Sequence, residues 1–382
     1  MAATLHSVIE STKKLLKLGV MSIIGIIFLV ILYRIGLVMK GELFPQAPEA
    51  FDVTFDKLPA IAFPENATKK TFTYTVETVN GELPIFPDRL FVYKIVNKTH
   101  ELFDLDRAKD KVEAVGFNRG ETHIVDNLYR WDKTKSFPAS IEMDIVSENF
   151  KLRSNFFSSA NFIAATGLPT EERAQEEATN FFATMGLFPP DIDNGQTKTT
   201  LLSIKGNTLV RATGFAKAQI IRVDFFQKSI IGTNDSEDTI PILYPNPPSS
   251  SINLHIGAEG ERGPQVIQAD YYHHTISDAK GDAATYPIKT SQEAFAELKE
   301  GNAYIAADFQ NATDVAIRNV YLAYYAGESL QDYLMPIIVF QGEGDSFFAY
   351  VSAVRNNCID DNEDPCDKSP LTNSAEIPAE NK

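Results

Sequence analysis

The chain has 382 residues, 44% of them hydrophobic, which is the composition of a globular protein with a sizeable core. It carries 51 acidic against 35 basic residues, for a formal net charge of −16. This balance excludes nucleic acid as the expected partner, because phosphates require a basic surface, and it suits a cationic partner. The two cysteines are too few for a fold that rests on a disulfide framework.

Residues 18–39 form a long apolar run in which Arg34 is the only charged residue. As a helix, such a run is long enough to cross a hydrocarbon core of about 30 Å. Lys13, Lys14 and Lys17 precede it, so residues 1–17 are expected to be cytoplasmic. The sequence thus predicts a single-pass signal anchor in the cell membrane, with the C-terminal domain extracytoplasmic. The alternative is a cleaved signal peptide, whose apolar region is normally shorter and ends in a small-residue cleavage site.

Residues 40–70 contain four prolines and predict a stiff, extended stalk. Residues 71–231 predict a first α+β region made of two helix-strand units. In its first helix, Leu105, Ala108 and Val112 recur at helical spacing after strands that include residues 89–96. Its second helix, residues 170–186, begins with acidic residues and ends at a glycine, and more strands follow.

Residues 232–264 are rich in proline, serine and glycine and predict a long loop or connection. Residues 265–356 predict a second α+β region, in which Thr290 and Glu293 form a capping-box pattern at the start of a helix. Four strand-like runs follow this helix. Residues 357–382 contain no aromatic residue, carry seven acidic residues against two lysines and predict a disordered tail.

The expected fold class is therefore α+β: one N-terminal transmembrane helix, followed by an ectodomain of repeated units. Each unit would place one helix on one face of an antiparallel sheet.

Residues 285–354 resemble the C-terminal part of YycH/YycI-type membrane-anchored regulators and, more broadly, PepSY-like modules. Three features support the resemblance: a short helix that contains Ala294 and ends at Gly301, a Leu-x-Tyr-Tyr pattern starting at Leu322, and a Leu-x-Pro-x-x-x-Phe pattern starting at Leu334. The resemblance implies PepSY-like units and non-enzymatic work at the cell envelope, such as restraint of a sensor kinase or of a peptidase. It supplies no catalytic residues.

No catalytic, phosphate-binding or dinucleotide-binding motif occurs in the sequence. His273 and His274 are adjacent on an expected strand, so their side chains should point to opposite faces and not share a metal ion. We expect no catalytic residues, no cofactor and no metal site. Cys358 and Cys366 form a possible disulfide, although free thiols remain the alternative.

Tyrosines supply the one candidate partner surface in the sequence. Tyr321 and Tyr325 lie on the same face of an expected strand, and Tyr333 begins the next strand. An exposed aromatic patch would bind a partner, whereas core packing is the alternative.

The expected function is a membrane-anchored, extracytoplasmic, non-enzymatic regulator or scaffold that binds another envelope protein. The expected contacts are the bilayer through residues 18–39 and that partner protein, with no nucleic acid. The alternative function is a binding module for peptide, lipid or cell-wall material, and an enzyme is a third reading.

Overall fold

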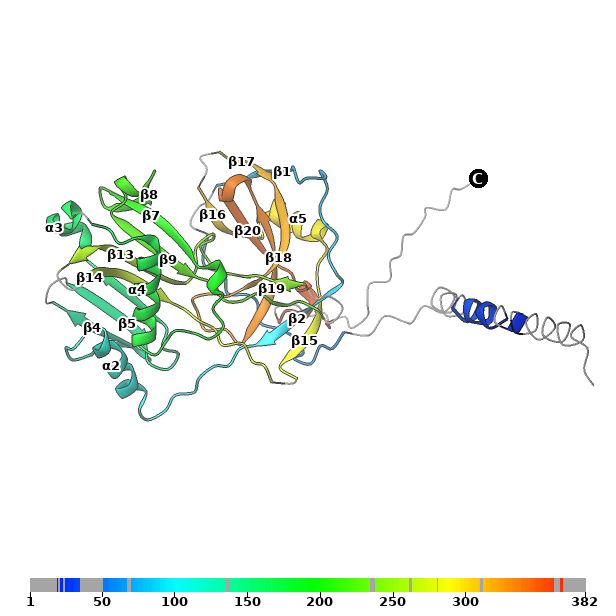
Figure 1. Ribbon diagram of the computed structural model, residues 1–382, viewed down its shortest axis with the longest axis horizontal. Helices are drawn as coiled ribbons and strands as arrows, with labels where there is room; N and C mark the ends of the chain where they lie inside the picture. Colours follow the sequence, from blue (N-terminus) through cyan, green and yellow to red (C-terminus); the bar gives the residue numbers. More distant parts are fainter. Residues whose placement is uncertain are drawn as a thin grey trace, which may run out of the picture. The chain divides into compact units, whose positions relative to one another are not determined.

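The computed structural model of the protein (Figure 1) comprises two compact units, residues 1–50 and residues 51–382. Each unit is described by itself. The residues that the structure describes are 19, 21–22, 25–34, 51–66, 70–134, 138–165, 167–233, 238–260, 263–279, 281–309, 312–360 and 365–366.

The described residues of the first unit are helical, and the longest continuous stretch covers residues 25–34. Across the described part of the chain, no helix combines the length and the apolar character that a membrane crossing requires. The predicted signal anchor at residues 18–39, and the membrane localisation deduced from it, are therefore wrong. Residues 1–17 lie outside the described residues.

Within the described part of the second unit, nine strands form one antiparallel sheet in the order β3-β4-β5-β6-β14-β13-β9-β7-β8. Its longest strands, β13 and β14, lie at the centre and form a hairpin. The strands are β3 (Thr122–Val125), β4 (Leu128–Lys133), β5 (Ala139–Asp144), β6 (Phe150–Ser154), β14 (Gly263–Tyr271), β13 (Ile252–Gly260), β9 (Ile220–Phe225), β7 (Lys198–Lys205) and β8 (Thr208–Arg211).

Two helices, α2 (Asp104–Ala114) and α4 (Glu171–Thr184), pack on the same apolar face of this sheet (Figure 1). The Thr170 side chain caps α4 by accepting a hydrogen bond from the Arg173 N–H at 3.2 Å. Buried residues recur every four positions along α4, which gives the helix one apolar stripe. They are Ala174, Ala178 and Phe182.

Seven further described strands form a second sheet, in which β12-β18-β19-β2-β15 follow one another, β20 pairs with β19 and β16 pairs with β20. Helix α5 (Ser291–Glu300) packs on it through Ala294 and Leu298. The strands are β12 (Ile242–Leu243), β18 (Asn319–Tyr325), β19 (Tyr333–Gln341), β2 (Arg89–Lys94), β15 (Ala283–Pro287), β20 (Phe347–Ser352) and β16 (Tyr304–Asp308); two smaller ladders join β1 (Thr73–Val76) to β17 (Asp314–Ile317) and β10 (Ile230–Ile231) to β11 (Thr239–Ile240).

The prediction of repeated helix-plus-sheet units is wrong. The molecule is mostly β-sheet, and α2 and α4 share one sheet instead of each covering its own. The sheets also do not follow chain order, because β2 belongs to the second sheet whereas β13 and β14 belong to the first. The periodic spacing of apolar residues indicates a helix or a strand from neighbouring residues alone, whereas strand pairing joins residues that are distant in the chain.

Two segments expected to lack regular packing contribute to the core. In the predicted stalk, Phe51, Val53 and Leu58 are buried beside Tyr286 of β15. The predicted connection at residues 232–264 contains β13, a central strand of the first sheet. Of the predicted tail, residues 361–364 and 367–382 lie outside the described residues.

Candidate functional site

A cleft of about 850 Å³ lies where one end of the nine-stranded sheet meets the second sheet. Glu142 of β5 and Lys151 of β6 line part of it, but most of its walls are connecting segments, which is where binding residues commonly occur. They are the chain after β2 (residues 95–98), the β3–β4 turn (125–128), the β5–β6 turn (144–149), the chain after α4 (186–190), the chain after β14 (271–275) and residues 328 and 330 after β18.

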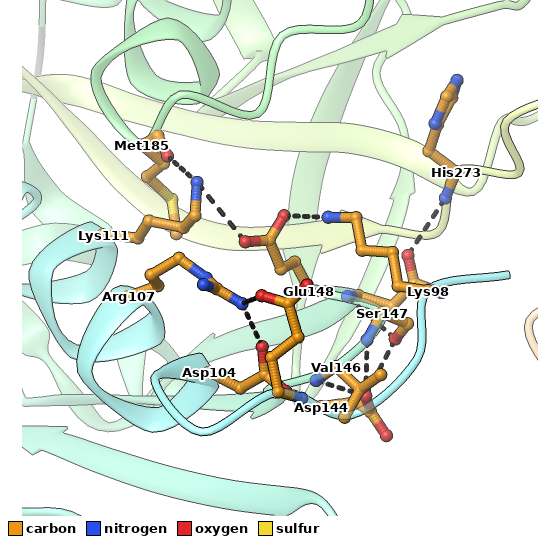
Figure 2. Close-up of polar contacts among 12 residues, drawn as sticks. Lys98, Asp104, Arg107, Lys111, Asp144, Val146, Ser147, Glu148, Met185 and His273 are labelled. Atoms are coloured by element: carbon orange, nitrogen blue, oxygen red, sulfur yellow. Dashed lines mark hydrogen bonds and ion pairs between the residues drawn. The ribbon is translucent and has the colours of Figure 1, made fainter.

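The β5–β6 turn is held by its own side chains (Figure 2). Oδ1 of Asp144 accepts hydrogen bonds from the backbone N–H groups of Val146 at 3.0 Å and Ser147 at 2.8 Å, and from the Ser147 hydroxyl at 3.1 Å. The next residue, Glu148, has a φ of +64°, in the left-handed region that non-glycine residues rarely adopt. This fixed backbone directs the Glu148 carboxylate into the molecule.

Two lysines from distant elements meet the Glu148 carboxylate (Figure 2). Lys98, on the chain after β2, places Nζ 2.5 Å from Oε2, and Lys111 of α2 places Nζ 3.5 Å from Oε1. Lys111 also donates to the carbonyl of Met185, at the end of α4, at 3.2 Å. The Glu148 carboxylate therefore ties the turn to α2 and to the chain after β2, and Lys111 extends this contact to the end of α4.

His273 belongs to a second polar cluster at the cleft wall. Its Nε2 donates to Asp191 Oδ1 at 2.9 Å, and the Gln227 amide donates to Asp191 Oδ2 at 2.8 Å. Burial raises the pKa of Asp191, but the hydrogen bonds and the charge of His273 outweigh it, so the pKa lies below its usual value. The Asp191 carboxylate therefore holds the His273 imidazole in one orientation.

His274 contacts a different partner, the carbonyl of Gly327, at 2.8 Å, and burial lowers the pKa of its imidazole. Across the described residues, no group of three or more His, Cys, Asp or Glu side chains is arranged to hold a metal ion.

An ion pair bridges the two sheets beside the cleft. Lys151 of β6 places Nζ 2.8 Å from Glu328, which follows β18, and lies over the Tyr272 ring at 5.1 Å. Partial burial lowers the pKa of Lys151, but the hydrogen bond and charge of Glu328 raise it above its usual value. Lys151 is therefore held as a cation in the wall.

Three apolar side chains that line the cleft are exposed to solvent instead of being buried in the core. Val96 is 52% exposed, Val125 is 53% exposed and Leu330 is 74% exposed. These three side chains, called the apolar rim below, offer surface that a bound partner would cover.

The tyrosines predicted as a partner surface are not brought together at this cleft. Tyr325 is buried among Phe63, Tyr304 and Tyr350, so it is core. Tyr321 is half-buried in a separate, shallow groove beside residues 78–85. Tyr333 is half-buried against Phe55, where its ring centroid lies 5.0 Å away.

Cys358 and Cys366 are bonded to each other, with their Cα atoms 4.3 Å apart. Sequence reasoning did not identify Glu148, Lys98 or the apolar rim. The sequence signals only a turn, through the turn-forming Asp144 and the polar residues Ser147 to Asn149. It does not reveal that two lysines converge on this turn.

Comparisons with known proteins give little further information. No protein-family model matches the chain, and no curated protein matches it. Among solved structures, the chain is similar to the crystal structure of an uncharacterized protein from Eubacterium rectale, with 13% sequence identity and a TM-score of 0.37. The match covers 70% of this chain and 84% of that one.

Proposed function

We propose that this protein is a non-catalytic binding protein that holds a segment of another protein in the cleft between its two sheets. The observation that carries the proposal is that one cleft is lined both by the exposed apolar rim and by charged side chains held in ion pairs and hydrogen bonds. A volume of about 850 Å³ lies within the range of pockets that enclose ligands.

The charges in the wall support binding more than catalysis. Glu148 and Glu328 each contact lysines, and Asp144 is occupied by the N–H groups of its own turn. These contacts make the wall rigid before a partner arrives, which lowers the entropic cost of association.

A random peptide library displayed on phage, panned against the purified full chain, tests the proposal. We expect a consensus that contains apolar residues, and we expect a double variant, Val96→Asp with Leu330→Asp, to lose it. Covering one leucine side chain contributes about 1.5–3 kcal/mol, so each charge introduced into the rim should weaken binding by about tenfold or more.

Ile85→Asp is the matched control, because Ile85 is 97% exposed and lies outside the cleft. This variant should retain the same peptides with unchanged affinity. Equal retention by the rim variant and the control would contradict the proposed function.

A further inference from the structure

The free edge of the nine-stranded sheet ends at the cleft. Strand β3 is the last strand of this sheet and pairs with β4 alone among the described strands. All four of its residues are exposed, including Ile124 at 46% and Val125 at 53%. Val125 and the three residues that follow it line the cleft.

An unpaired strand edge presents a row of backbone N–H and C=O groups to which another extended chain can add. Proteins commonly protect such edges with lysine or proline, with short strands or with bulges. Strand β3 carries neither lysine nor proline, but it is only four residues long. A register shift between His123 and Val125 shortens its regular ladder with β4, so an added strand would pair over only a few residues.

The charged side chains that line the cleft are predominantly acidic. Among the described residues that line it, five carry a carboxylate and two carry a lysine ammonium group. Lys98 and Lys151 pair with Glu148 and Glu328, and Asp144 is occupied by its own turn, which leaves two carboxylates to meet a cation. Asp126, at the end of β3, is exposed, and Glu142 of β5 approaches a cation, Arg130, only at 3.8 Å. The lining carboxylates are Asp126, Glu142, Asp144, Glu148 and Glu328, and the lysines are Lys98 and Lys151.

We propose that β3 accepts an extended segment of the partner protein by strand addition, and that basic side chains of this segment enter the acidic cleft. The inference rests on the proposed function and adds a binding mode and a partner chemistry to it. Backbone pairing at β3 supplies affinity that does not depend on the sequence of the partner segment. Ile124 and Val125 favour apolar side chains in this segment, and the acidic lining favours lysine or arginine.

The test uses three labelled nonapeptides and the full chain. The probe alternates lysine and valine, and the second peptide replaces each lysine with glutamate. The third is the probe with every backbone nitrogen between its ends methylated, so that neither of its edges can pair as a strand. Fluorescence anisotropy gives each affinity, and hydrogen exchange locates each contact. We expect the probe to bind about tenfold or more tightly than either of the other two, and to slow exchange of the β3 amides.

Asp126→Asn with Glu142→Gln is the variant for the acidic lining. Asparagine tolerates the positive φ of 46° at position 126, so the fold should be kept. We expect this variant to bind the probe about three- to tenfold more weakly and the glutamate peptide no more weakly than the wild type does.

Several outcomes would overturn the inference. They are equal affinity for the basic and acidic peptides, undiminished binding of the methylated peptide, and no binding of the probe at about 1 mM. Protection of the 144–149 turn without β3 would also overturn strand addition but leave the proposed function standing. Binding of the probe that survives Val96→Asn with Leu330→Asn would instead count against the proposed function, because these changes remove apolar surface without adding a charge that attracts lysine. A dimer in sedimentation velocity, with β3 protected in the protein alone, would assign the edge to a second copy of the chain.

Discussion

Replacing Glu148 with glutamine tests whether one carboxylate holds the cleft wall. The substitution keeps the shape of the side chain and its backbone geometry but removes the charge that Lys98 and Lys111 contact. Distance alone would make Lys98 the stronger partner, since its Nζ lies 2.5 Å from the carboxylate and that of Lys111 lies 3.5 Å away. The exposed fractions of the lysine side chains predict that Lys111 is the stronger partner. The Lys98 side chain is 55% exposed and that of Lys111 is 21% exposed, while Glu148 itself is 14% exposed.

An exposed ion pair contributes about 0.2–1 kcal/mol, so we assign about 0.5 kcal/mol to Lys98. At an effective dielectric constant of about 20, unit charges 3.5 Å apart attract by about 5 kcal/mol before desolvation is subtracted. We assign about 1–2 kcal/mol to Lys111 after desolvation, because the pair is largely sheltered from water. Glu148→Gln should therefore lower the free energy of unfolding by about 2 kcal/mol.

Urea unfolding measures this change in stability, and double-mutant cycles divide it between the contacts with Lys98 and Lys111. The coupling of Glu148→Gln with Lys111→Met should exceed its coupling with Lys98→Met. Glu176→Gln is the control, because Glu176 is 68% exposed and lies 3.9 Å from Arg173, and it should change stability by less than about 0.5 kcal/mol. A loss below about 0.5 kcal/mol for Glu148→Gln, or a larger coupling to Lys98, would refute the reasoning.

Two further predictions concern the disulfide and a buried histidine. Cys358 and Cys366 are eight positions apart. From the chain entropy of so short a loop, we expect changing both cysteines to serine to lower the free energy of unfolding in urea by about 2.5 kcal/mol. An unchanged unfolding midpoint would contradict this prediction. Burial lowers the pKa of His255 from 6.5 to about 3. Between these pH values the unfolded chain binds a proton at His255 and the folded protein does not. The stability that neutral His255 contributes is complete above about pH 6.5 and declines as the pH falls toward about 3, and His255→Gln should flatten this decline. Parallel curves for the two proteins between these pH values would show that another group causes it.

Several local features were predictable because neighbouring residues fix them. The capping box at α5 is present, with the Thr290 hydroxyl accepting from the Glu293 N–H and the Glu293 carboxylate accepting from the Thr290 N–H. Gly301 ends that helix with a φ of +82°, a conformation in which a side chain would be strained. The apolar stripe of α4 likewise follows from the spacing of Ala174, Ala178 and Phe182.

The cleft was not predictable in the same way, because its residues are far apart in the chain. Lys98, Lys111 and Glu148 lie on three different elements, and no spacing in the sequence signals that they converge. The prolines and serines of residues 232–264 resemble those of a linker, yet this segment includes β13, whose burial depends on its neighbours β9 and β14.

By itself, the sequence determined the acidic character of the protein, the positions of α4 and α5, and the absence of a catalytic motif. Charge is additive, and a helix is specified by residues within a few positions of one another, so neither needs a tertiary context. Only the tertiary structure decided that α2 and α4 share one sheet, that Tyr325 is core, and that β3 is an edge strand beside an acidic cleft. The physical reason is that sheet order and clefts arise from contacts between residues distant in the chain, and such contacts have no local pattern to predict them.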